Sequence, residues 1–220
     1  MKEIKKLNYL NKLNINDELD SMILAIHDES RDGEVPIILD DGLDYLLSVV
    51  NIKKPKKILE IGTAVGFSAI MMARNSEAII DSIERNQEMY QKAVENVLKM
   101  KLGKRIKLHF ADALLIDNNE LDKEYDIIFI DAAKAQNQKF FLKYKDLLKD
   151  DGIIITDNIL FHGLVEKYAE GNTLDGVSKD LKAMVRKIHE YNLWLKSLED
   201  YKTIFINIGD GIALTMRKSL

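Results

Sequence analysis

The sequence predicts an α/β fold, in which a mostly parallel, doubly wound sheet of the Rossmann-like type has helices on both faces. From residue 57 onward, short β-rich runs alternate with helical stretches, a pattern typical of βαβ units. A glycine-containing turn follows the first run and opens a helix, as in sheets that bind a ligand beyond their strand ends. With 46% hydrophobic and 31% charged residues, the composition is that of an ordinary globular chain.

Two helices are expected before the first strand. Apolar residues recur at helical spacing over residues 15–30, with Asn16 or Asp17 as N-cap, and again over residues 43–50. We therefore expect a single domain, 1–220, with an N-terminal helical cap (1–52) and a Rossmann-like core (53–220).

The core is expected to alternate regularly and then to end in a hairpin. Strands are predicted at 57–61, 78–83, 105–110, 125–130 and 152–157, and helices at 66–74, 86–101, 113–121 and 135–149. A long amphipathic helix over 177–195 follows, whose apolar face places Tyr191 and Trp194 in the core. Two further apolar runs, joined through Gly209-Asp210-Gly211, predict an antiparallel hairpin.

The composition excludes several classes of protein. The 220 residues include no cysteine, which removes disulfides, thiolate catalysis, Cys-ligated zinc and iron–sulfur clusters, so a metal would need oxygen or histidine ligands. Neither a signal peptide nor an apolar run of about 18 residues is found, so we expect a cytoplasmic protein that does not enter a membrane.

The segment from Glu60 to Ser68 carries the first functional signal. Gly62 and Gly66 would let a cofactor approach the backbone at the end of the first strand, although they could also serve only the turn and helix packing. Glu84 ends the second strand 22 residues after Gly62, which suits a carboxylate that binds ribose hydroxyls. The G-x-x-x-G spacing lacks the tighter pyrophosphate-binding motif and disfavours a dehydrogenase.

Acidic residues near this loop favour S-adenosylmethionine as the cofactor. The charge of Glu60 would complement its amino group or sulfonium but would repel a diphosphate. Asp112 and Ala113, after the third strand, could contact the adenine. Each acid also has a structural alternative: Glu84 as a surface residue and Asp112 as a helix N-cap. A nucleotide-binding module without methyl transfer is therefore a further alternative.

Oxygen ligands follow the next two strands. Asp131 closes the fourth strand, and Asp157 and Asn158 close the fifth, so their side chains could meet around one point. Mg²⁺ or another hard divalent cation prefers such ligands, although both aspartates could instead cap helices. Lys134 follows Asp131 by one helical turn; it could be a solvated side chain, or, beside a cation, a general base.

The motifs LEIGTAVGFSA, SIE, FIDAAK and TDN together resemble the metal-dependent catechol and caffeoyl-CoA O-methyltransferase family, from about residue 20 to the end. The resemblance implies a class I methyltransferase fold with a seven-stranded sheet that ends in the hairpin, often as a homodimer. It implies metal ligation by Asp131, Asp157 and Asn158, with Lys134 as the base. It also implies that S-adenosylmethionine is bound by Ile38, Glu60, Gly62, Ala64, Gly66, Ser68, Glu84, Ala113 and Asp131.

Three segments, EVPIILDD, TDNILFHGLV and KIHEYNLWL, are most similar to the bacterial tRNA 5-hydroxyuridine methyltransferases, which modify the wobble uridine. The chain has His162 where members of that branch carry arginine. The expected substrate is the tRNA anticodon loop. The alternative substrate is a small catechol-like or phenylpropanoid phenol.

A tRNA substrate needs a basic surface, although the net charge of the chain is −4. Residues 17–44 hold ten acids and one arginine, so the rest of the chain carries a net charge of +5. Two basic runs could bind phosphates, or could be ordinary solvated faces. They are Lys99, Lys101, Lys104, Arg105 and Lys107, and Lys179, Lys182, Arg186, Lys187 and Lys196.

Overall fold

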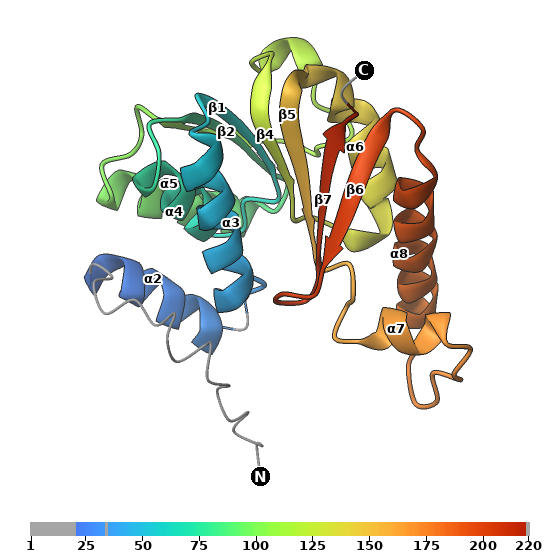
Figure 1. Ribbon diagram of the computed structural model, residues 1–220. Helices are drawn as coiled ribbons and strands as arrows, with labels where there is room; N and C mark the ends of the chain where they lie inside the picture. Colours follow the sequence, from blue (N-terminus) through green and yellow to red (C-terminus); the bar gives the residue numbers. More distant parts are fainter. Residues whose placement is uncertain (1–20, 34, 219–220) are drawn as a thin grey trace.

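A computed structural model describes residues 21–33 and 35–218 of the protein. One seven-stranded sheet, in the order β3-β2-β1-β4-β5-β7-β6, runs through the molecule with helices on both faces (Figure 1). Strands β1 to β5 are parallel, and β7 pairs antiparallel with both β5 and β6. This confirms the predicted class I methyltransferase fold and its C-terminal hairpin.

The strands lie close to their predicted positions. They are β1 (Lys57–Ile61), β2 (Ile79–Glu84), β3 (Ile106–Phe110), β4 (Tyr125–Ile130), β5 (Leu148–Asp157), β6 (Tyr201–Ile206) and β7 (Ile212–Arg217). Only β5 differs by more than one residue, because its pairing with β4 already begins at Leu148.

The α-helices are α2 (Ser21–Asp32), α3 (Asp40–Lys53), α4 (Phe67–Arg74), α5 (Gln87–Lys99), α6 (Asn137–Tyr144), α7 (Leu164–Ala169) and α8 (Lys179–Ser197). Three 3₁₀ turns are η1 (Asn118–Glu120), η2 (Lys134–Gln136) and η3 (Lys145–Leu147). Helix α7 was not predicted. The expected N-cap, Asn16 or Asp17, lies outside the described residues.

The helix predicted over 113–121 is wrong, because that segment forms a turn followed by η1. Two of its carbonyl groups accept hydrogen bonds from side chains of α6: the Tyr144 hydroxyl donates to Ala113 O, and Lys143 Nζ donates to Ile116 O at 2.6 Å. Asp117 then caps η1 through a capping box. The helix predicted over 135–149 is likewise divided into η2, α6 and η3.

Two hydrophobic cores lie on the two faces of the sheet. Helices α2, α3 and α4 pack on one face with the end of α5, and α6 and α8 pack on the other. Tyr191 of α8 is 2% exposed and shares a hydrogen bond of 2.9 Å with Thr156. Trp194 stands edge-on to Phe141 with ring centroids 5.1 Å apart. Both aromatic residues therefore belong to the core, as predicted.

The parallel strands all end at one edge of the sheet, and α2 and α7 lie at that same end of the molecule (Figure 1). This arrangement brings the strand ends, the start of α3 and the segment before α7 around a common space. In the part of the chain that the structure describes, no helix is long and apolar enough to cross a membrane.

Candidate active site

The loop after β1 is shaped for a close approach of backbone to backbone. Gly62 has φ = 100°, and a Cβ placed there would lie 2.2 Å from the carbonyl oxygen of Asp131. Gly66, with φ = 84°, precedes α4 and packs on Ala93, where a Cβ would come within 3.4 Å. Both positions need glycine, so the two predicted glycines serve the turn and the helix packing as well as the site.

A cavity of about 680 Å³ opens at this edge of the sheet. That volume is in the range of pockets that enclose a cofactor and a small substrate. Eight predicted site residues line it: Gly62, Ala64, Glu84, Asp112, Ala113, Asp131, Lys134 and Asn158. The other predicted residues, Ile38, Glu60, Gly66, Ser68 and Asp157, are buried beside it and do not line it.

Glu84 closes β2 and holds the glycine loop. Its two carboxylate oxygens accept hydrogen bonds from the backbone N–H groups of Ala64 and Asn86 at 2.9 and 2.8 Å. A carboxylate oxygen can accept a second hydrogen bond, so Glu84 can still bind a hydroxyl group in the cavity. Glu84 is therefore more than the surface residue of the alternative interpretation.

Asp112 has both a structural contact and a place in the cavity wall. One carboxylate oxygen accepts the Leu114 N–H at 2.8 Å, which caps a turn and not the helix that was considered. The other lies 3.6 Å from the guanidinium of Arg85, which also lines the cavity.

Glu60 is fully buried under the glycine loop. It accepts hydrogen bonds from Ser68 Oγ at 2.5 Å and from the Ser82 hydroxyl, and Ser82 is in turn 2.5 Å from the Thr63 hydroxyl. Burial raises the pKa of Glu60 to about 8, against the effect of these hydrogen bonds. The predicted residues Glu60 and Ser68 are thus brought together beneath the loop.

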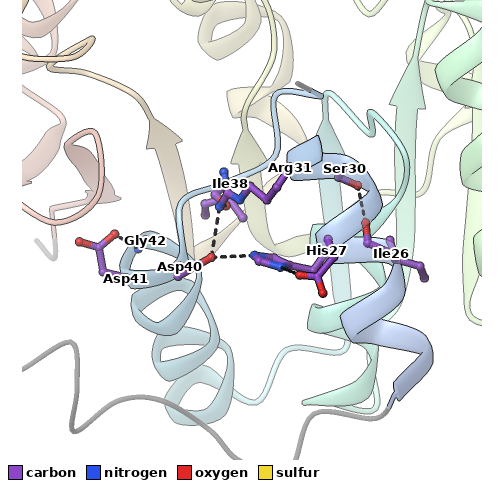
Figure 2. Close-up of polar contacts among 9 residues, drawn as sticks. Ile26, His27, Ser30, Arg31, Ile38, Asp40, Asp41 and Gly42 are labelled. Carbon is purple, nitrogen blue, oxygen red and sulfur yellow. Dashed lines mark hydrogen bonds and ion pairs between the residues drawn. The ribbon is translucent and has the colours of Figure 1, made fainter. Parts of the chain in front are cut away.

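The helical cap closes one side of the cavity. It contributes Arg31, Val35, Pro36, Ile37 and Leu39 to the wall. Arg31 Nη2 donates to the carbonyl oxygen of Ile38 at 3.0 Å and to Asp40 Oδ1 at 3.1 Å, and His27 Nε2 lies 3.1 Å from the same Asp40 oxygen (Figure 2). These contacts hold Ile38 at the start of α3.

Acidic side chains gather where β4 and β5 end. Asp157 is 2% exposed, and its burial together with the charge of Asp131 raises its pKa to about 7, while Lys134 opposes that shift. Lys134 Nζ contacts Asp131 Oδ1 directly. Asn158, the next residue, has a left-handed backbone with φ = 62°. The structure therefore brings the predicted ligands and the predicted base to one end of the cavity.

Sequence reasoning missed several residues of this site. Phe161 and Asp210 also line the cavity, beside Asn158, together with His162, which the sequence marked only as the position of an arginine in the tRNA branch. The sequence placed Asp210 only in a hairpin turn. Its position between two glycines could have marked it, because such a turn can place the side chain close to a neighbouring loop.

The fold and these strand-end residues can be compared with known proteins. The family described as O-methyltransferase matches residues 25–218. The chain belongs to this family. An Arabidopsis thaliana protein assigned to the caffeoyl-CoA O-methyltransferases is 32% identical over 189 residues, which cover 84% of this chain and 79% of that protein.

Solved structures of O-methyltransferases are similar over nearly the whole chain. A Staphylococcus aureus protein assigned to the caffeoyl-CoA O-methyltransferases has a TM-score of 0.83 and 38% identity, over 90% of this chain and 93% of that one. A Bacillus cereus O-methyltransferase in complex with SAH has a TM-score of 0.78 and 24% identity over 96% of both chains. The second comparison shows the common fold.

Proposed function

We propose that this O-methyltransferase uses S-adenosylmethionine and a divalent cation such as Mg²⁺ to methylate the 5-hydroxyl of 5-hydroxyuridine at the tRNA wobble position, forming 5-methoxyuridine. One observation carries the proposal: the same cavity is lined at one end by Glu84 and Asp112 and at the other by Asp131, Lys134 and Asn158. The residues proposed for a nucleoside cofactor and oxygen donors proposed for a cation therefore line one space.

The residues fit S-adenosylmethionine, which supplies a methyl group on a sulfonium centre. Gly62 lines the cavity and lets the loop after β1 lie against the backbone of Asp131, since any side chain there would meet that backbone. Glu84 would bind the ribose hydroxyls, and Asp112 and Ala113 would border the adenine. The remaining residues proposed for the cofactor are Ile38, Glu60, Ala64, Gly66, Ser68 and Asp131.

The acidic end fits a hard divalent cation. Asp157 is buried, and its burial, followed by the charge of Asp131, raises its pKa. Two such carboxylates with the Asn158 amide oxygen are donors that Mg²⁺ prefers. When bound, Mg²⁺ would supply positive charge that acidifies and orients the substrate hydroxyl.

Lys134 is proposed as the proton acceptor. Its side chain is 18% exposed and borders the cavity, and its Nζ contacts Asp131. Beside a bound divalent cation the ammonium of Lys134 could release its own proton to solvent, and the neutral amine could then take the proton of the substrate hydroxyl, whose oxygen attacks the methyl carbon in line with the departing sulfur. Orientation within the cavity would supply about 7–11 kcal/mol of barrier reduction at most.

A small phenol is the second candidate substrate. A catechol and 5-hydroxyuracil both present two neighbouring oxygens, so one cation site can bind either. The similarity to proteins assigned to the caffeoyl-CoA O-methyltransferases favours the phenol. The segments that resemble the tRNA branch favour the nucleoside.

One assay separates the two substrates. Methyl transfer from labelled S-adenosylmethionine is measured to tRNA from a strain that lacks this protein and, in parallel, to catechols. We expect labelled tRNA containing 5-methoxyuridine. Labelled phenol with inert tRNA would contradict the tRNA proposal and support the second candidate. Binding of NADH without binding of S-adenosylmethionine would contradict both.

The two basic runs differ in their position relative to the cavity. Lys104 precedes β3, whose other end borders the cavity, and Arg105 donates to the carbonyl oxygens of Ser76 and Ala78. This run therefore lies away from the site. Helix α8 packs against η2 and α7 next to the cavity, and Lys182 on it is exposed. We propose that α8 carries the phosphate contacts.

A charge reversal at each run tests this assignment. Lys182→Glu should weaken tRNA binding and make the affinity less dependent on salt, whereas Lys104→Glu should leave both unchanged. Equal effects of the two variants would contradict the assignment to α8. The homodimer and the cytoplasmic location remain predictions, and sedimentation and cell fractionation would test them.

A further inference from the structure

The tip of the β6–β7 hairpin is docked against the loop formed by residues 158–163. Ile159 N donates to Gly211 O at 3.0 Å, and Leu160 N donates to Asp210 O at 2.9 Å. Gly211 has φ = 82°, and a Cβ there would lie 2.5 Å from Leu160 Cγ. Any side chain at residue 211 would therefore separate the tip from the loop.

The 158–163 loop has a strained backbone. Asn158, Phe161 and His162 have positive φ angles of 62°, 46° and 55°. Such angles are unusual for residues other than glycine, particularly for a bulky aromatic residue, and each costs about 1–3 kcal/mol unless the surroundings hold it. The hairpin tip supplies part of that support, and the loop begins with the proposed ligand Asn158.

Asp210 provides the side-chain contact between tip and loop. It is 6% exposed, and its Oδ1 accepts the backbone N–H of His162 at 2.5 Å. Its Oδ2 is buried and has no hydrogen bond within the residues that the structure describes. The ring nitrogen Nδ1 of His162 lies 3.7 Å from Oδ2, which is too long for a hydrogen bond, and the His162 side chain is 74% exposed. One oxygen of this buried carboxylate therefore has no hydrogen-bond donor within the described residues.

The carboxylate of Asp210 adds a negative charge to the end of the cavity where Asp131 and Asp157 lie. Asp210 borders the same cavity as Asp131 and Asn158. Within the described residues, however, no three Asp, Glu, His or Cys side chains converge closely enough to hold an ion. Asp210 is therefore placed beside the ligands and not among them.

We propose that Asp210 is a positioning residue for the cation site. Its Oδ1 fastens the loop that orients Asn158, and its Oδ2 adds a negative charge and a hydrogen-bond acceptor behind the ligands. Partners of this kind commonly change metal affinity by about 10–100-fold. The inference rests on the proposed function, because it assumes that Asp131, Asp157 and Asn158 bind a divalent cation.

Titration with Mn²⁺, followed by electron paramagnetic resonance, tests this role without measuring turnover. Asp210→Asn keeps an oxygen that can accept the His162 N–H but removes the charge. We expect its Mn²⁺ affinity to fall about tenfold. Without metal, its unfolding midpoint should rise, because a buried repulsion has been removed. Calorimetry should show an unchanged affinity for S-adenosylmethionine.

Three further variants complete the experiment. Asp210→Ala should lose Mn²⁺ affinity further, because the loop contact is also lost. Asp157→Asn should abolish Mn²⁺ binding, and Asp180→Asn, at an exposed position on α8, should change nothing. These variants separate the charge of Asp210 from its hydrogen bond and from a general charge effect.

The outcomes decide separately between this inference and the proposed function. If Asp157→Asn loses Mn²⁺ while Asp210→Asn binds it as the wild type does, the role of Asp210 is refuted and the cation site stands. If Asp210→Asn loses both stability and affinity, Asp210 only supports the fold, and the inference is also wrong. If the wild type does not bind Mn²⁺, both the cation site and the inference fail.

Discussion

The two ends of the cavity satisfy their polar groups in different ways. At the end lined by Glu84 and Asp112, which we call the cofactor end because we propose that it binds S-adenosylmethionine, both oxygens of Glu84 accept backbone N–H groups. Beneath it, both oxygens of Glu60 accept hydrogen bonds from hydroxyl groups. At the acidic end, Asp157 and Asp210 are buried with Lys134 as the cation that opposes their charge, and Asp210 Oδ2 has no hydrogen bond within the described residues. The first end is complete as folded, whereas at the second the described residues set one lysine, Lys134, against three aspartates, Asp131, Asp157 and Asp210.

The backbone shows the same contrast. The cofactor end places its two largest positive φ angles on Gly62 and Gly66, where they cost little, and one smaller angle of 45° on Ala64. The acidic end places them on Asn158, Phe161 and His162, where they cost more. The strained backbone and the excess of negative charge at the acidic end indicate that a bound cation would stabilise this end. The following changes test that difference, from the largest expected effect to the smallest.

Removal of Asp157, the buried residue proposed to bind the cation, should have the largest effect. We expect Asp157→Ala, or EDTA with the wild type, to lower kcat by at least about 100-fold, because the substrate hydroxyl is no longer acidified or oriented. The affinity for S-adenosylmethionine, measured by calorimetry, should stay within about threefold, because the cofactor end is complete by itself. Full activity in EDTA would remove the metal from the mechanism.

Removal of the proposed base should act on the chemical step. Lys134→Ala is expected to lower kcat by about 100-fold and to change KM much less, because proton transfer is lost while the ligands remain. Steady-state kinetics with saturating S-adenosylmethionine measure both constants. An unchanged kcat would exclude Lys134 as the base.

A side chain at Gly62 should damage both ends together. Gly62 has φ = 100°, and Gly62→Ala would place a Cβ 2.2 Å from the carbonyl oxygen of Asp131. We expect the free energy of unfolding to fall by roughly 3 kcal/mol and the affinity for S-adenosylmethionine to fall as well. Gly171→Ala is the matched control, since φ is 78° there and nothing lies within 4 Å. It should cost about 1 kcal/mol. Equal losses in urea unfolding would mean that the contact with Asp131 does not matter.

Glu60 should make the stability of the cofactor end depend on pH. Its pKa is about 8 in the folded protein, against an ordinary value of 4.5. The folded state therefore holds a proton that the unfolded state has released, and Glu60 lowers stability as pH rises from about 4.5 to about 8. Urea unfolding at several pH values should show that Glu60→Gln gains stability over the wild type across this range. A difference independent of pH would show that the pKa is not raised.

Much of the fold was predictable because its signals are local. The strand over 125–130 and the helices after the first two strands follow from runs of apolar residues and their spacing, and their observed bounds agree closely. The helix predicted over 113–121 does not form: Tyr144 and Lys143, which are distant in sequence, donate to two of its carbonyl groups, and Asp117 caps η1 instead. Local propensity does not include such contacts.

The sequence by itself determined the sheet, the hairpin and the strand-end positions of Glu84, Asp131 and Asp157, because the ends of parallel strands must meet at one edge. Only the tertiary structure decided that Glu60 lies beneath the loop and that Asp210 reaches the acidic end. Asp210 is brought there because the β6–β7 hairpin docks on a loop about fifty residues earlier in the chain. That docking requires glycine at residue 211, where a Cβ would lie 2.5 Å from Leu160 Cγ. Burial and partner choice depend on such distant contacts, and spacing along the chain does not encode them.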